Sequence, residues 1–217
     1  MNIPSNFRVE AARRIQTELG HRIIEEDRLP QEVKTVGGVD AAYRGELAAA
    51  TCVVLDYASL RLLEAKTAKA KVIFPYIPTL LSFREAPPIF KVFRLLEVKP
   101  DVLIVNGHGV AHPYGCGLAS YVGVILKQPT IGVASRLLCG EVGPKIGDIA
   151  PVIYGGRTVG AALFTEARRP IYISVGNMVS LERAAALTRS LLCGSRMPAP
   201  LKVADALAKR TVRRLEV

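Results

Sequence analysis

A change in the hydrophobic pattern near residue 99 most constrains the fold of this chain. Before it, residues 35–72 read as three strands joined by tight turns, which predicts an antiparallel meander. After it, two short and continuous apolar runs at 101–107 and 130–134 flank the amphipathic segment 118–127. Continuous apolar runs are typical of strands that are buried on both faces of a sheet. The sequence therefore predicts an α/β fold with one mixed central sheet, antiparallel and parallel, flanked by helices.

The rest of the chain supplies further strands and the covering helices. Apolar residues recur at helical spacing through residues 1–30, which predicts an N-terminal helix that packs on the domain. Strands are expected at 151–156, 157–165 and 170–176, and helices at 79–96, with an interruption or tilt at Pro87-Pro88, and at 180–192. The basic tail, residues 200–217, is expected to be partly helical and solvated, with contact to phosphate as the alternative. No linker or repeat divides the chain, so residues 1–217 are expected to form a single domain.

The charge balance points to a polyanionic partner. Lysine and arginine outnumber acidic residues by 29 to 19, which gives a net charge of +10. Such an excess favours nucleic acid or an acidic surface, although solubility alone also explains it. No apolar run reaches the roughly 18–20 residues of a membrane span, and the start of the chain lacks the pattern of a secretory signal. We therefore expect no membrane contact and a cytoplasmic location.

The cysteines carry no recognisable chemistry. The four thiols lie far apart in the sequence and form no CxxC pair. Their spacing argues against a zinc site and favours reduced thiols.

Three polar groups stand out against this apolar background. Asp40 lies inside the first strand, where a carboxylate without a partner is costly to bury, unless the strand is an edge strand with a solvated face. Glu85 lies near the start of a predicted helix, where a carboxylate also suits the helix dipole without any catalytic role. Asn106 and Gly107 follow a buried strand, with His112 one turn later. The carboxyl ends of strands in α/β sheets face the crevice that binds ligands.

Taken together, these segments resemble the endonuclease V family, the deoxyinosine 3′-endonucleases with a ribonuclease H-like fold. The resemblance extends from about residue 36 to about residue 192. The runs that carry it are VGGVDAAY, PYIPTLLSFREAPP, PDVLIVNGHGVAHPYGCGLASYVG, PTIGVASRLLCGE and PIYISVGNMVSLERAAALT. The combination of PYIP, FRE and NGHGVAHP is specific.

The resemblance implies a role for each matching residue. Asp40 and Glu85 match metal-binding acids of the family, and Asn106 stands where the family has a second metal-binding aspartate. The resemblance also implies Mg²⁺ as cofactor, with Mn²⁺ as a substitute. The segment implied to wedge into the duplex, with its tyrosine filling the space of the flipped base, consists of Pro75, Tyr76, Ile77 and Pro78. Gly107 matches the pocket for hypoxanthine, and His112 is implied to contact the substrate.

Several positions depart from the family pattern. Asn106 replaces an aspartate, Ser135 replaces the lysine of GVAKS, and Asn177 replaces a histidine that usually follows the SxG of the late strand. Tyr114 and Tyr121 also replace an arginine and a histidine of the family. A neutral amide at position 106 is expected to weaken Mg²⁺ binding, because this ion binds most strongly to negatively charged ligands. Loss of a proton-transfer group typically lowers a rate by about 10²–10⁴.

Three functions are compatible with this sequence. The first is a Mg²⁺-dependent DNA repair endonuclease, with weakened activity, that hydrolyses the second phosphodiester 3′ to a deaminated base and leaves a 3′-hydroxyl and a 5′-phosphate. The second is a catalytically silent protein that recognises lesions or inosine in nucleic acid. The third is a nuclease for RNA or single strands. The expected partner is double-stranded DNA with deaminated bases, bound by a monomer.

Overall fold

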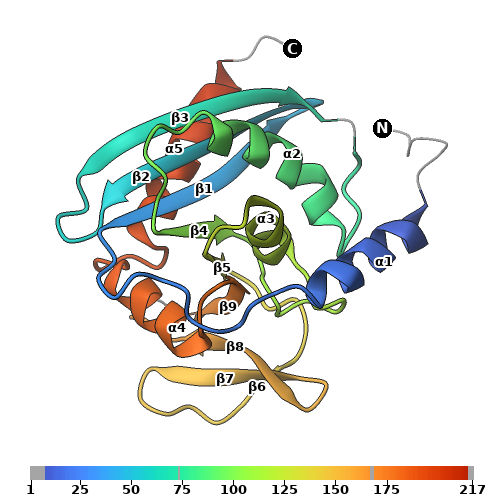
Figure 1. Cartoon of the computed structure of the whole chain (residues 1–217), viewed down its shortest axis with the longest axis vertical. Helices are drawn as coiled ribbons and strands as arrows, with labels where there is room; N and C mark the ends of the chain where they lie inside the picture. Colours follow the sequence, from blue (N-terminus) through green and yellow to red (C-terminus); the bar gives the residue numbers. More distant parts are fainter. Residues whose placement is uncertain (1–7, 73, 167–168, 215–217) are drawn as a thin grey trace.

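A computed structural model describes residues 8–72, 74–166 and 169–214. Within these residues nine strands form one continuous sheet in the order β3-β2-β1-β4-β5-β9-β8-β7-β6 (Figure 1). The strands are β1 Thr35–Arg44, β2 Leu47–Asp56, β3 Leu62–Lys71, β4 Val102–Asn106, β5 Thr130–Ala134, β6 Glu141–Val142, β7 Ile149–Tyr154, β8 Arg157–Leu163 and β9 Ile171–Asn177. Strands β1, β4 and β5 are parallel neighbours, and the other pairs are antiparallel. The predicted mixed sheet is therefore confirmed, and β6 is an addition that the sequence pattern did not predict.

Helices cover both faces of this sheet. They are α1 Val9–Gly20, α2 Leu81–Arg94, α3 Leu118–Leu126, α4 Leu181–Ser190 and α5 Ala199–Arg213. On one face, α2 and α3 pack over Val39, Leu103 and Val105. On the other face, α4 and α5 pack over Val36 and Ile104. Odd and even residues of β1 and β4 thus belong to two different cores, as the alternation of side chains along a strand requires.

The N-terminal helix is shorter than its periodicity predicts. Helix α1 ends at Gly20, and the chain continues without regular structure to the start of β1. The backbone N–H of Ile24 bonds to the side chain of Asn177 (3.1 Å), and the carbonyl of Ile24 accepts from Met178 N (2.6 Å). Ile23 and Leu29 still pack against the core. The prediction of a helix to residue 30 was wrong because an irregular segment buries the same apolar residues, and residues 1–7 lie outside the described part.

Two further expectations about helices need correction. Helix α2 runs from Leu81 to Arg94 with Pro87 and Pro88 inside it, so the expected interruption is absent from this helix. The basic tail is a regular helix of 15 residues, α5, whose apolar side packs on the core, so the expected solvation holds only for its exposed basic side chains. A Cβ on Gly38 would lie 2.4 Å from the carbonyl of Pro200, so only glycine allows α5 to approach β1 this closely. In Figure 1, α5 lies behind the sheet and α2 in front of it.

None of the described helices is both long and apolar enough to cross a bilayer.

Candidate active site

Asp40 and Asn106 are neighbours on adjacent parallel strands. Val39 of β1 pairs with Val105 of β4, so the next residue on each strand faces the other across the sheet. Both side chains share the side of Val36 and Ile104, which is the side covered by α5. Asp40 is only 7% exposed. The structure thus brings together two of the predicted metal-binding residues, although they are 66 positions apart in the sequence.

Helix α5 adds a carboxylate that the sequence analysis did not select. Asp205 lies in the second turn of α5 and is the only acidic residue of that helix. Its side chain lies so close to Asp40 that its charge and a hydrogen bond between the two carboxyls both raise the pKa of Asp40. The Lys209 Nζ lies 2.8 Å from Asp205 Oδ2, one helical turn further on. Asp205 is therefore part of the same acidic group.

The pKa of Asp40 reflects this crowding. Burial is the main cause that raises the pKa from 3.8 to about 6, and the neighbouring Asp205 adds to the rise. Asn106 and the backbone N–H of Ala41, 2.8 Å from Oδ1, lower the pKa. Because the interaction with Asn106 favours the ionised carboxylate, the amide nitrogen of Asn106 must be the donor. An aspartate at position 106 would have the opposite effect.

Glu85 reaches the same group from the opposite layer of the fold. It lies in the first turns of α2, the helix that covers the other face of the sheet. Burial is the first cause that raises the pKa of Glu85 from 4.5 to about 8, and the charge of Asp40 is the second. The buried hydroxyl of Tyr43 lies beside this carboxyl and has no hydrogen-bond partner of good geometry, while the Arg84 guanidinium lies 4.6 Å from the centre of the Tyr43 ring. Glu85 and Asp40 are thus electrostatically coupled acids.

The donor set fits a hard divalent cation. Within the described residues, no three histidine, cysteine or acidic side chains are gathered closely enough to form a metal centre of their own. The carboxylates of Asp40 and Asp205, the amide oxygen of Asn106 and the carboxylate of Glu85 are nevertheless all oxygen ligands, which Mg²⁺ prefers. The pKa values of Asp40 and Glu85 stay raised although Arg84 lies near Glu85 and Lys209 pairs with Asp205, so these cations compensate the buried acids only in part. A divalent cation would supply the remaining positive charge.

The PYIP segment forms an anchored loop with an exposed tip. Phe74 and Leu80, at its two ends, are buried in one small cluster with Ala12 of α1. Arg84 Nη1 donates to the carbonyl of Phe74 (2.7 Å), which fixes the loop to α2. Tyr76, between these anchors, is 69% exposed. An exposed aromatic ring on a fixed base is the form that an intercalating wedge needs.

His112 is buried and anchors the end of this loop. Its Nε2 lies 3.0 Å from the carbonyl of Thr79, and its Nδ1 accepts from the backbone N–H of Tyr114 (3.2 Å). Burial lowers the pKa of His112 to about 4, so the ring is neutral at pH 7 with its proton on Nε2. Gln16 of α1 donates to the same Thr79 carbonyl (2.9 Å). His112 therefore positions the loop, and direct contact with substrate stays a prediction.

Gly107 directly follows Asn106 at the edge of the sheet. Its backbone N–H donates to the carbonyl of Val133 (3.0 Å), and a Cβ on it would lie 3.1 Å from Leu118 Cβ. A side chain here would crowd the start of α3, so glycine allows Leu118 to pack closely against this backbone. Gly107 is buried, and its part in a base pocket stays a prediction.

The substituted positions do not all belong to this site. Ser135 follows β5 on the same edge as Asn106, is exposed, and its carbonyl accepts from Arg196 (2.9 Å). Asn177 pairs with Thr130 at the other end of β5. Thr130 is three residues from Val133, the partner of Asn106, which is about 10 Å along the strand at 3.3 Å per residue. The amide of Asn177 is buried and donates to the carbonyl of Gly123 (3.2 Å). This side chain ties the segment after α1 to α3, so its placement gives no support to the proton-transfer role predicted for a histidine at position 177.

The two tyrosine substitutions have packing roles. Tyr121 of α3 contacts the rings of Phe83 and Phe90, with centroids 5.5 and 6.1 Å away, and so joins α3 to α2. The Arg13 guanidinium lies 5.2 Å from the centre of the Tyr114 ring, which joins α1 to the loop after β4.

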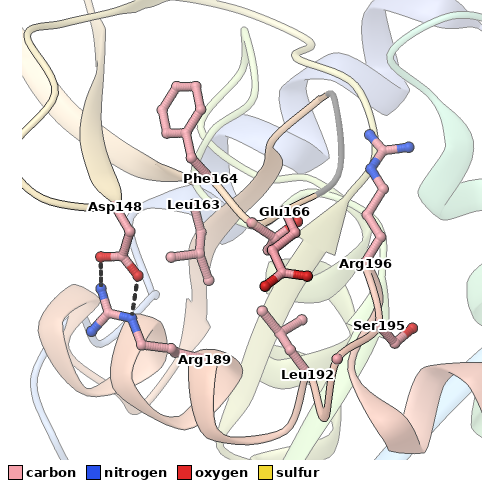
Figure 2. A pocket seen from close by; sticks show the side chains of 10 residues that line it. Asp148, Leu163, Phe164, Glu166, Arg189, Leu192, Ser195 and Arg196 are labelled. Atoms are coloured by element: carbon pink, nitrogen blue, oxygen red, sulfur yellow. Dashed lines mark hydrogen bonds and ion pairs between the residues drawn. The ribbon is translucent and has the colours of Figure 1, made fainter.

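A separate pocket lies at the ends of β8 and α4, and β8 is the third strand from β4 in the sheet. Figure 2 shows Arg189 paired with Asp148, with bonds of 2.6 and 2.9 Å, on one side of this pocket, and Glu166 and Arg196 on the other. None of the predicted site residues lines it. We therefore keep it apart from the acidic group.

Comparisons with known proteins agree with this geometry. The profile of the family Endonuclease V matches residues 17–206. An Endonuclease V of Thermofilum pendens is 41% identical over 213 residues, which cover 97% of this chain and 92% of that protein. The crystal structure of the Endonuclease V of Streptomyces avermitilis superposes with a TM-score of 0.88 at 37% identity, and covers 97% of this chain and 96% of that one.

A further solved structure includes nucleic acid. The Endonuclease V of Ciona intestinalis, in complex with a 24mer DNA that contains an inosine followed by a ribo-adenosine, superposes with a TM-score of 0.88 at 30% identity. The match covers 96% of this chain and 99% of that one. The shared ribonuclease H-like architecture and the match over most of the sequence lead to one conclusion: this chain belongs to the endonuclease V family.

Proposed function

We propose that this protein is a divalent-metal-dependent endonuclease that cleaves DNA at the second phosphodiester 3′ to a deaminated base. The observation that carries this proposal is that Asn106, Asp205 and Glu85 each interact with Asp40 at one edge of the sheet. The exposed ring of Tyr76 stands on the loop that leads into the helix of Glu85. The solved relative from Ciona intestinalis, bound to DNA with an inosine, supports the choice of substrate.

The residues divide the chemistry between them. Asp40 and Asp205, with the amide oxygen of Asn106 and with Glu85, would hold Mg²⁺, or Mn²⁺ as a substitute. A bound Mg²⁺ would polarise the phosphate and lower the pKa of the attacking water. Glu85, with a pKa of about 8 before any cation is present, is protonated in the resting site at pH 7 and must release this proton when positive charge enters. The products would carry a 3′-hydroxyl and a 5′-phosphate.

Asp205 bears on whether the site is active. With Asn106 neutral, Asp40 and Glu85 alone would offer two carboxylates to the ion. Asp205 raises this number to three, and its contact with Asp40 places its charge directly at the site. Mg²⁺ is usually held by one or two carboxylates together with waters and substrate phosphate. Asp40 and Asp205 with the amide of Asn106 would therefore suffice, even though the described residues contain no preformed cluster of three acids. This favours an active nuclease over a silent binding protein.

The exposed wedge supports recognition of an extruded base. Unstacking a base costs a few kcal/mol, and an aromatic side chain that enters the stack compensates for part of it. Tyr76 is exposed and free to enter a duplex, while Gly107 is buried, and its assignment to the base pocket stays a prediction. A deaminated base in a mismatch is among the least costly to extrude. Monomeric state and cytoplasmic location remain predictions from the sequence.

The test is a cleavage and retention assay on matched substrates. A duplex with one deoxyinosine, the same duplex without it, the inosine single strand and an RNA counterpart are incubated with Mg²⁺, Mn²⁺ or EDTA. We expect cleavage of the inosine duplex with either metal, none in EDTA, and loss of cleavage in Asp40→Asn but not in the control Asp148→Asn, which alters an exposed ion pair. Tyr76→Ala should reduce the preference for the inosine duplex.

Three outcomes would contradict the proposal. Retention of inosine DNA without cleavage by the wild-type protein would establish the silent binding protein. Faster cleavage of RNA or of single strands would establish the alternative substrate. Cleavage that survives Asp40→Asn would show that the acidic group is not the active site.

A further inference from the structure

The outer face of α5 carries a row of cations that begins at the acidic group. An open groove is lined by Asp205, Ala206, Lys209, Arg210, Arg213 and Arg214. The four basic residues are exposed, whereas the opposite side of α5 is buried against the sheet. The groove therefore runs from a carboxylate of the site along the helix toward its C-terminal end.

This arrangement is costly for the helix alone. Lys209 with Arg213 and Arg210 with Arg214 are like-charge pairs at i, i+4, and each such pair destabilises a helix by about 0.2–0.5 kcal/mol. Among the described residues, α5 forms one ion pair, from Lys209 to Asp205, and its three arginines form none. The C-terminal helix dipole offsets a part of the repulsion. A concentrated anion would offset the remainder.

We propose that this face of α5 binds the phosphodiester backbone of the nucleic acid beside the scissile phosphate. The proposal rests on the proposed function, because it takes the acidic group as the place of cleavage. At 1.5 Å per residue, Asp205 and Arg213 are separated by about 12 Å along the helix axis. A nucleic-acid strand rises about 3.4 Å per nucleotide, so the groove spans about three to four nucleotides.

Lys209 is the first cation of this row and lies nearest the site. Its ammonium is 2.8 Å from Asp205, which in turn contacts Asp40. Position 135, directly after β5, carries a serine, whereas the outer face of α5 carries four basic side chains. At the far end, Arg44 of β1 donates to the carbonyl of Arg213 (3.1 Å), which adds a further basic side chain beside the last turn.

The test measures DNA binding rather than cleavage. The affinity for a fluorescent 25-base-pair duplex is measured in EDTA at several salt concentrations between 50 and 200 mM, for wild type, Arg213→Gln and Arg210→Gln/Arg213→Gln. The matched control is Lys202→Gln, which removes one exposed charge from the same helix on the other side of Asp205, outside the groove. Arg213→Lys keeps the charge and controls for shape.

Each phosphate contact contributes about 0.9 to the slope of log K against log salt. We expect Arg213→Gln to reduce the slope by about one and the double variant by about two. Over the fourfold salt range, wild type should then lose about tenfold more affinity than the double variant. Lys202→Gln and Arg213→Lys should keep the wild-type slope. Equal slopes for Arg213→Gln and Lys202→Gln, in variants with unchanged thermal unfolding, would overturn the proposal.

The outcome can be separated from that of the proposed function. If the wild-type protein cleaves inosine DNA and the slopes do not differ, only the role of α5 is refuted. If the slopes differ as expected and no cleavage occurs, α5 binds the DNA backbone and only the proposed nuclease activity is refuted.

Discussion

The substitution Glu85→Gln tests the electrostatics of the acidic group without any substrate. A carboxyl whose pKa rises from 4.5 to about 8 on folding binds its proton more tightly in the folded than in the unfolded state. The folded state is therefore favoured at low pH, and this contribution is lost as the pH rises from about 4.5 through about 8. At about 1.4 kcal/mol for each tenfold difference, ionisation of Glu85 costs the metal-free fold about 5 kcal/mol in full.

Most of this loss falls within an accessible pH range. Between pH 5 and pH 8, wild type should lose about 3.5 kcal/mol of unfolding free energy through Glu85. Glutamine has a similar shape and no charge to bury, so Glu85→Gln should be more stable than wild type at pH 8 and lose less stability over this range. Urea unfolding in EDTA at both pH values measures the difference, with Glu18→Gln, on the exposed side of α1, as the control for one lost charge.

Mg²⁺ provides the second arm of this experiment. The cation should stabilise wild type at pH 8 more than Glu85→Gln, because the ionised carboxylate is the form that binds. Parallel pH profiles of wild type and Glu85→Gln in EDTA would refute the reasoning, since they would show that the carboxyl is not buried beside Asp40.

Three other substitutions test individual parts of the site. Asp205→Asn should lower metal-dependent cleavage of inosine DNA by about 10²-fold or more in single-turnover assays while DNA retention is kept, and a near-normal rate would remove Asp205 from the site. Asn106→Asp should reduce the Mg²⁺ concentration for half-maximal rate and, in EDTA at pH 8, lower the melting temperature through repulsion with Asp40; an unchanged metal requirement would contradict the proximity of the two side chains. Asn177→His should destabilise the protein by about 1–3 kcal/mol in urea without raising activity, because it breaks the buried hydrogen bonds to Ile24 and Gly123; a gain in cleavage would return position 177 to the site.

The sequence predicted the sheet well because its signals are local. Alternation in residues 35–72 and the continuous apolar runs of β4 and β5 reflect burial on one or two faces, which each segment experiences by itself. The N-terminal segment shows the limit of such signals. Ile23 and Leu29 fit a helical stripe, yet they reach the core from an irregular chain that is held by Asn177. Apolar spacing records which residues are buried and not which backbone conformation buries them.

The residues of the candidate site likewise include some that the sequence predicted and one that it did not. Asp40, Glu85, Asn106 and the exposed Tyr76 stood out from their sequence surroundings and from the family resemblance. Asp205 did not, because it is one acid in a basic and otherwise ordinary amphipathic helix. The available signal was a single acid, one residue after the buried Ala204, in a helix without other acids. This signal becomes informative only when the surface on which α5 packs is known.

The amino-acid sequence by itself determined the alternation of strands and helices, the excess of positive charge, and the acids and aromatic loop of one family. Only the tertiary structure decided which of these residues meet. The pairing of β1 with β4 places Asp40 beside Asn106, and the packing of α5 on Gly38 brings Asp205 to the same point while it directs the basic residues outward. The physical reason is that the apolar pattern of each segment indicates which of its residues are buried. The contact between two distant charges depends instead on strand register and helix docking, which the whole chain determines together.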